Sequence, residues 1–168
     1  ISALRELGED CSFNKVEMND TKIGVITSGI AYMYAKEALG DKASYLKLGM
    51  VYPLPEKLIL DFAKKVDKLY VIEELDPIIE THVKSLGINV VGKEMFSILG
   101  EFSQKTIADA FHIEAKESVS ADSSVPNRPP MMCAGCPHRG MFYTLAKNKI
   151  TVHGDIGCYT LGAVPPLN

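Results

Sequence analysis

Short apolar runs and amphipathic helical patterns alternate along the first two thirds of the chain. Residues 23–27 (Ile-Gly-Val-Ile-Thr) form a run rich in β-branched residues, as expected of a strand buried on both faces. A helical pattern over 31–39 follows and stops at Gly40, a residue typical of helix ends. Strands that alternate with helices need crossover connections. The pattern therefore predicts an α/β fold with a mostly parallel sheet and flanking helices.

The same alternation continues after Gly40. Further strands are expected at 45–48, 68–73 and 88–92, and further helices over 56–66 and from about Pro77 to Gly87. Apolar residues of the helix over 56–66 recur at i, i+3 and i+4 spacing, which gives it one buried face. Proline is well placed in the first turn of a helix, which supports the start near Pro77.

Composition divides the chain into four parts. Residues 1–20 begin with a helical pattern and then turn polar, so we expect the tail of an upstream segment, followed by one domain over 21–115. Residues 116–130 are polar and serine-rich and end in a proline-rich stretch, which predicts a linker. Residues 131–168 are expected to start a second, truncated α/β domain.

The second domain is expected to open with a cysteine-containing turn. A helix over 137–147, a strand over 150–153 and a glycine-rich turn then follow. This order is that of one strand–helix unit of a parallel sheet.

Charge and hydropathy exclude two classes of partner. The chain is 46% hydrophobic and 23% charged with a net charge of -3, so it lacks the basic surface that binds nucleic acid. Its apolar runs are far shorter than the roughly 18 residues needed to span a bilayer. We therefore expect no nucleic-acid or membrane partner, and a cytoplasmic protein.

Two cysteines at CxxC spacing are the first candidate site. Cys133 and Cys136 can hold one metal ion or iron–sulfur cluster, because a tight turn points both sulfurs inward. Pro137 favours a helix start and places Cys136 near the N-cap, where a thiolate or a bound anion is favoured. The structural alternative is a pair of small residues buried in a turn.

A glycine-rich segment is the second candidate site. Its sequence is Gly154-Asp155-Ile156-Gly157-Cys158-Tyr159-Thr160-Leu161-Gly162. It follows an expected strand and so belongs at the carboxyl end of a sheet, where open α/β folds bind ligands. Glycines let backbone N–H groups approach a phosphate, and Thr160 adds a hydroxyl. A plain strand-to-helix turn is the alternative, since neither standard nucleotide fingerprint is present.

Several other polar residues have less specific readings. Glu73, Glu74 and Asp76 lie at the end of an expected strand, and we interpret them as carboxylates at a helix N-terminus rather than as an acid–base group. His138 and His153 lie beside the cysteine motifs and are candidates for contact with a cofactor or metal ion.

The two motifs together resemble a known family. Residues 128–140 and 154–162 closely resemble the start of the diphosphate-binding domain in large (alpha) subunits of indolepyruvate ferredoxin oxidoreductases. Residues 22–115 look like the transketolase carboxy-terminal-type domain that precedes it in that family. Thr27-Ser28-Gly29, Tyr52-Pro53-Leu54-Pro55 and Val71-Ile72-Glu73-Glu74 carry this looser match.

The resemblance implies an internal piece of a thiamine-diphosphate enzyme. Members of this family oxidatively decarboxylate indolepyruvate and other aryl pyruvates to acyl-CoA, and pass electrons through 4Fe-4S clusters to ferredoxin. The implied cofactors are thiamine diphosphate, Mg²⁺ and 4Fe-4S clusters held mostly outside this chain, with coenzyme A as co-substrate. The implied partners are the small (beta) subunit and ferredoxin. Because parts of the active site lie outside this chain, we expect it to be inactive alone.

The resemblance also assigns site residues, although it identifies no catalytic residue. The implied cofactor-binding residues are Gly154, Asp155, Ile156, Gly157, Cys158, Tyr159, Thr160 and His138. The implied metal ligands are Cys133, Cys136 and Cys158. The non-enzymatic alternative is a zinc-stabilised interaction module, in which the same cysteines and His138 or His153 complete four tetrahedral ligands.

Overall fold

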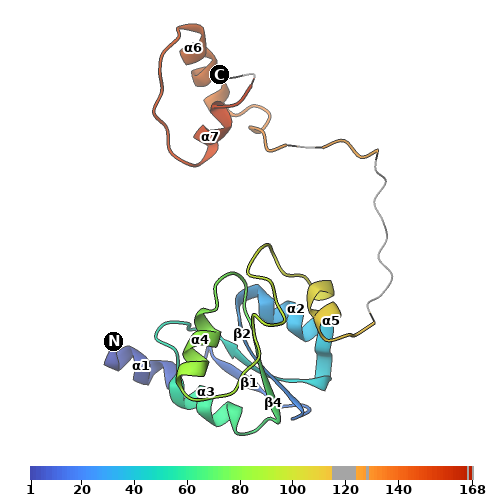
Figure 1. Cartoon of the computed structure of the whole chain (residues 1–168). Helices are drawn as coiled ribbons and strands as arrows, with labels where there is room; N and C mark the ends of the chain where they lie inside the picture. The colour runs from blue at the N-terminus through green and yellow to red at the C-terminus, as the bar shows by residue number, and fades with distance from the viewer. Residues whose placement is uncertain (115–123, 128, 166, 168) are drawn as a thin grey trace. The chain divides into compact units, whose positions relative to one another are not determined.

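A computed structural model describes residues 1–114, 124–127, 129–165 and 167. The chain divides into two compact units, Ile1–Glu117 and Ser118–Asn168 (Figure 1). Most of the predicted linker over 116–130 lies outside the described residues. Among the helices of the described residues, none has the length and apolar character needed to cross a membrane.

A four-stranded sheet forms the centre of the first unit. Its strands are β1 (Lys15–Glu17), β2 (Ile23–Ser28), β3 (Ser44–Leu48) and β4 (Lys68–Ile72), in the order β1-β3-β2-β4. β2 pairs in parallel with both β3 and β4, so that Val25 lies opposite Tyr45 and Tyr70. β1 pairs antiparallel to β3. The predicted α/β class with a mostly parallel sheet is confirmed.

Helices cover both faces of this sheet (Figure 1). The helices of the unit are α1 (Ser2–Glu9), α2 (Gly29–Leu39), the short 3-10 helix η1 (Gly40–Lys42), α3 (Glu56–Ala63), α4 (Ile78–Ser85) and α5 (Gln104–Ala110). Successive side chains of a strand point to opposite faces. Val25 accordingly packs in the core cluster with α2 and α5, and Ile26 packs in the cluster with α3 and α4. Both side chains are fully buried.

The prediction of a strand over 88–92 is wrong. Val91 makes a single parallel bridge with Tyr70, in which its N–H donates to Leu69 O and its carbonyl accepts from Val71 N. The pairing stops there, because the next alternate N–H, that of Lys93, donates to the Glu80 carboxylate at 2.8 Å. The Glu80 carboxylate thus takes the place of the backbone carbonyl that would accept the next hydrogen bond of a β-ladder.

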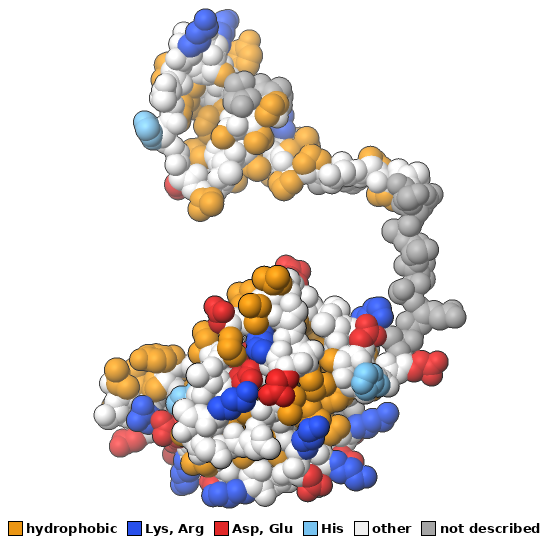
Figure 2. Space-filling view, viewed as in Figure 1, with side chains coloured by type: hydrophobic (Ala, Val, Ile, Leu, Met, Phe, Trp, Pro, Cys, Tyr) orange, Lys and Arg blue, Asp and Glu red, His pale blue; other side chains and the backbone are white. Residues whose placement is uncertain are grey.

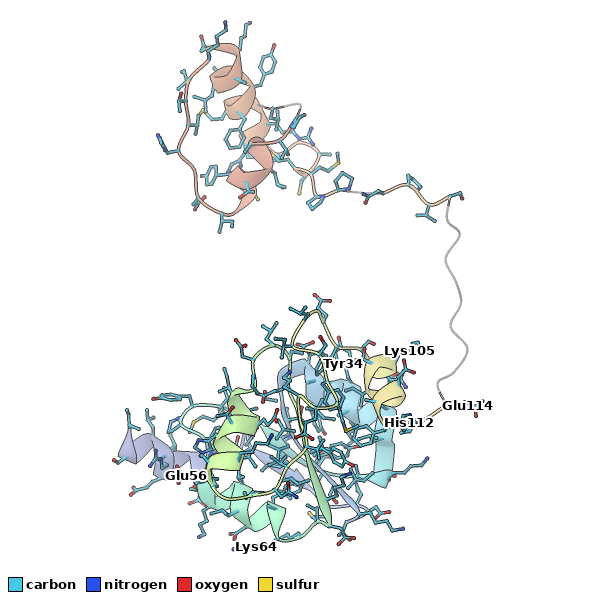
Figure 3. All side chains as sticks on the ribbon, in the orientation of Figure 1. Tyr34, Glu56, Lys64, Lys105, His112 and Glu114 are labelled. Carbon is cyan, nitrogen blue, oxygen red and sulfur yellow. The ribbon has the colours of Figure 1, made fainter. Side chains whose placement is uncertain are left out.

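Residues 1–20 are held to the β3–α3 connection. The Glu9 carboxylate accepts bonds from the N–H groups of Lys57 and Leu58, at 2.9 and 2.8 Å, in the first turn of α3. Arg5 of α1 lies 3.7 Å from Glu56, at the start of α3 (Figure 3). Asn14 Oδ1 accepts from the N–H groups that follow β3. The segment expected as an upstream tail therefore supplies α1 and the edge strand β1 to this unit.

A polar network joins β1 to α2. The Tyr32 hydroxyl donates to Glu17 Oε1 at 2.5 Å, and the Lys36 ammonium pairs with the same carboxylate. The bond from Lys36, and then that from Tyr32, hold the pKa of Glu17 below its ordinary value. Because β1 has only three residues, this network adds to a short ladder of backbone bonds.

The second unit contains two helices and, in its described residues, no strand. These are α6 (Pro137–Lys147), which confirms the helix predicted over 137–147, and α7 (Cys158–Gly162). The strand expected over 150–153 is wrong, since these residues have no regular structure. A strand needs a neighbour for its backbone groups, and the described part of this unit offers none.

The Glu9 contact predicts a loss of stability when the carboxylate is removed. Glu9→Ala leaves two N–H groups at the start of α3 without this acceptor and should lower the free energy of unfolding by about 1 kcal/mol. Urea denaturation of the chain measures the change. Glu6→Ala, an exposed acid on the same helix, is the matched control, and equal effects of both substitutions would contradict the capping role.

The Glu17 network predicts a contribution to acid sensitivity. Its lowered pKa means that the network stabilises the fold above the ordinary value of 4.5 and loses this effect as pH falls through the lower folded value. Glu17→Gln should therefore weaken the fold at neutral pH but flatten the loss of stability below about pH 4.5. Thermal melts from pH 7 to pH 3 test this, and parallel curves for the two proteins would refute it.

Candidate functional site

The CxxC motif forms a closed turn at the start of α6. The Cys136 N–H donates to the Cys133 carbonyl at 3.2 Å, and Gly135 between them has φ +71°, which suits glycine. The Arg139 side chain reaches back and donates to the carbonyls of Met132 (2.5 Å) and Cys133 (3.1 Å). The turn is therefore held by its own backbone and by the helix that follows it.

Cys136 occupies the N-cap of α6, as predicted from Pro137. Its Sγ lies 3.5 Å from His138 Nδ1, whereas Cys133 is exposed. The contact places an imidazole beside the sulfur at the N-terminus of the helix, where free backbone N–H groups favour a bound anion.

Three aromatic rings join the CxxC helix to the glycine-rich segment. The Tyr159 ring of α7 lies 5.2 Å from His138 and 5.9 Å from Phe142, centroid to centroid, and both pairs are edge-on. Gly162 lets the two helices approach, because a Cβ at this position would lie 2.8 Å from Cε2 of Phe142. The structure thus brings the two motifs together through side chains of α6 and α7.

A cavity of about 550 Å³ opens beside this contact. Of the predicted cofactor-binding residues, it is lined by Gly154, Asp155, Tyr159 and Thr160. Its remaining lining residues are Phe142, Leu145, Ala146, Lys149, Ile150, Val152, Gly162, Ala163 and Leu167. The lining is largely apolar and includes a few polar side chains, which is the usual character of a cofactor site.

The other predicted cofactor-binding residues lie outside the lining of this cavity. The Ile156 side chain is 95% exposed. Gly157 is the N-cap of α7 and Cys158 is exposed in its first turn. His138 contacts the Tyr159 ring instead. The structure therefore divides the predicted set into residues that line the cavity and residues that hold or flank α7.

The three predicted metal ligands do not converge. Within the described ranges, no group of three or more His, Cys, Asp or Glu side chains has an arrangement that could hold a metal ion. Cys136 has His138 as a neighbour, and Cys158 begins a different helix. Metal or cluster ligation by Cys133, Cys136 and Cys158 stays a prediction.

A second hollow, which the sequence reasoning did not predict, lies in the first unit. β2 leads into α2 on one face of the sheet and β4 leads into α4 on the other, so the carboxyl ends of these neighbouring strands form a topological switch point. A groove of about 370 Å³ lies there, lined by residues 28–31, 51, 73–76, 78 and 79. Two features of the sequence could have indicated this groove. They are Ser28-Gly29 at the end of β2 and the carboxylates that follow β4.

Glu73, which lines this groove, holds the first turn of α4 through its side chain. Its buried carboxylate accepts bonds from the N–H groups of Ile79 and Glu80, both at 2.9 Å, in the first turn of α4. Burial raises the pKa of Glu73, against the opposing effect of these two bonds. For Glu73 the interpretation as a carboxylate at a helix N-terminus is confirmed.

Comparison with known proteins places the chain in a family, although no family model matches it. It is 35% identical to indolepyruvate oxidoreductase subunit IorA of Thermococcus kodakarensis, over 99% of this chain and 30% of that protein. The IorA subunit of Archaeoglobus fulgidus is 36% identical over 92% of this chain and 29% of its own length. That of Methanothermobacter marburgensis is 32% identical over 97% and 31%.

A solved structure is also similar. It is a 2-oxoglutarate:ferredoxin oxidoreductase from Magnetococcus marinus with 2-oxoglutarate, coenzyme A and succinyl-CoA bound, at a TM-score of 0.49 and 18% identity, over 59% of this chain and 19% of that chain. The chain spans about 30% of the length of the curated relatives that it matches. Over that segment, it belongs to the IorA subunit family of indolepyruvate oxidoreductases.

Proposed function

We propose that this chain forms part of a 2-oxoacid:ferredoxin oxidoreductase that decarboxylates indolepyruvate and other aryl pyruvates oxidatively to acyl-CoA. Similarity to IorA subunits along nearly the whole chain carries this proposal. Coenzyme A is the acyl acceptor, and ferredoxin receives the electrons. The partners are a small (beta) subunit and ferredoxin. The chain alone is inactive, because it matches about 30% of the length of its relatives.

We further propose that the cavity beside α7 contributes to a thiamine diphosphate site. Its volume of about 550 Å³ lies in the range of cofactor pockets, and its polar lining residues include Lys149, Gly154, Asp155 and Thr160. When bound, thiamine diphosphate supplies the nucleophilic carbon and the electron sink that decarboxylation of a 2-oxoacid requires. In this proposal Mg²⁺ and most of the diphosphate contacts come from residues outside this chain.

The residues of this chain position and enclose the site. Thr160 Oγ1 donates to Asp155 O at 3.5 Å, which closes the glycine-rich loop onto α7. His138 and Phe142 hold the Tyr159 ring, and with it α7, against α6. The apolar walls, such as Leu145 and Val152, exclude water from one side of the cavity. Their role is positioning, and no proton transfer is assigned to them.

The three cysteines are not assigned a step in the proposed reaction. Cys133, Cys136 and Cys158 do not converge in the described part of the chain, so no electron-transfer step is derived through them. A 4Fe-4S cluster or a zinc ion on these sulfurs remains a prediction, and the other clusters of the enzyme belong to parts of the subunit outside this chain.

Substitution of Tyr159 tests the positioning role. In the full-length subunit with its small partner, we expect Tyr159→Ala to lower indolepyruvate-dependent reduction of viologen by about tenfold or more, since displacing a site by an ångström has that scale of effect. Tyr159→Phe keeps both ring contacts and should retain most activity. Tyr143→Ala, an exposed tyrosine on α6, is the matched control. Parent-level activity of Tyr159→Ala under anaerobic assay would count against the proposed site.

Substitution of the cysteines separates the cluster, the zinc module and packing. If the three sulfurs bind a cluster, Cys133→Ser and Cys158→Ser in the full-length subunit should each lower iron content and keto-acid activity together. Iron and zinc are measured by elemental analysis of anaerobically purified protein. Unchanged iron content and unchanged keto-acid activity would mean that these cysteines serve only in packing. Stoichiometric zinc in a protein with no keto-acid activity would instead support the interaction module.

A further inference from the structure

The groove at the carboxyl ends of β2 and β4 has an exposed apolar rim. Its large apolar side chains are Ile30, Val51, Leu75 and Ile78, of which Leu75 and Ile78 are 63% and 69% exposed. Single exposed apolar residues are common, but a group of them around a hollow is typical of a surface that binds another molecule.

The groove also carries an excess of negative charge. Its lining includes Glu73, Glu74 and Asp76, and none of the described lining residues is Lys, Arg or His. Lys93 lies beside the groove, where its ammonium donates to the Glu73 carbonyl at 2.5 Å and lies 5.2 Å from the centroid of the Phe102 ring. Glu73 is buried against the first turn of α4, and Glu74 Oε1 already accepts from the Phe102 N–H at 2.8 Å. The exposed carboxylate of the groove is that of Asp76, with the half-buried Glu74 beside it. Figure 2 shows Asp and Glu side chains beside hydrophobic, Lys and Arg side chains on the visible face of this unit.

Leu75 adds a conformational observation. It has φ +58°, a left-handed backbone conformation that is costly for a residue with a branched, bulky side chain and natural for glycine. The sequence nevertheless places leucine there, with its side chain directed to solvent at the rim. Glycine would adopt this conformation at lower cost, so the folding of this unit does not by itself explain the exposed leucine.

We propose that this groove docks a segment of a partner protein in which a lysine or arginine is flanked by apolar side chains. The apolar flanks cover Ile30, Leu75 and Ile78, and the cation pairs with the carboxylates of Glu74 and Asp76. Charge complementarity selects this occupant. A second copy of the chain is disfavoured because the chain has a net charge of -3, and an anionic membrane or nucleic acid would be repelled by the groove. The inference is independent of the reaction proposed above.

Peptide titration of the 168-residue chain tests the proposal. The probes are acetyl-Gly-Leu-Arg-Leu-Gly-amide and the same peptide with glutamate in place of arginine, followed by methyl NMR. The arginine peptide should shift the Ile30, Leu75 and Ile78 methyl signals saturably and more weakly at high salt, and the glutamate peptide should not. Absence of saturable shifts, or equal shifts with both peptides, overturns the proposal.

Two variants with matched controls complete the test. Asp76→Lys should weaken the arginine peptide by about tenfold or more, while Glu37→Lys, with the same charge change at an exposed position near the end of α2, should not. Leu75→Gly should weaken the peptide but leave the melting temperature unchanged or higher, because glycine accepts the left-handed conformation. Equal effects of Asp76→Lys and Glu37→Lys overturn the proposal. So do groove shifts that depend on protein concentration alone, which would indicate a second copy.

Discussion

The burial of β2 on both faces is the constraint on which the first unit depends. Val25 and Ile26 are completely buried in opposite core clusters, and the strand pairs in parallel on both of its edges. A central parallel strand forces its neighbours to be connected through helices on the two faces. The chain after β2 and the chain after β4 therefore leave in different directions, and the switch-point groove is a consequence of that topology rather than of any single motif.

The second unit relies on far fewer contacts. Without a sheet in its described residues, α7 is held to α6 by the His138, Phe142 and Tyr159 rings and by the close approach at Gly162. The glycine-rich segment and the CxxC turn are separated in sequence by residues 137–153, and this packing brings them together. The candidate cofactor cavity exists because α7 rests on α6, so its shape is sensitive to the same few side chains.

The local pattern of apolar and polar residues predicted two kinds of element correctly: strands that are buried on both faces, and a helix with a clear start signal in the sequence. The runs at β2, β3 and β4 are apolar on both faces, and α6 starts at Pro137 as expected. The three-residue strand β1 escaped prediction because its pairing with β3 is a long-range contact with little sequence signal. The run over 150–153 has strand propensity but pairs with no strand among the described residues, so propensity alone gave a wrong prediction there. The groove at the ends of β2 and β4 and the positions of the predicted metal-ligating cysteines depend on tertiary packing. The spacing of residues in the sequence does not predict such packing.

We propose that the packing of α7 on α6 forms part of a thiamine diphosphate site, and measurement of thiamine diphosphate binding by the full-length subunit tests this proposal. Calorimetric titration with Mg²⁺ compares Gly162→Ala, whose Cβ would meet the Phe142 ring, with Gly140→Ala, whose Cβ on α6 meets nothing within 4 Å. We expect weaker binding, by about tenfold, for Gly162→Ala alone. Parent-level affinity in Gly162→Ala, or an equal loss in both variants, would contradict it.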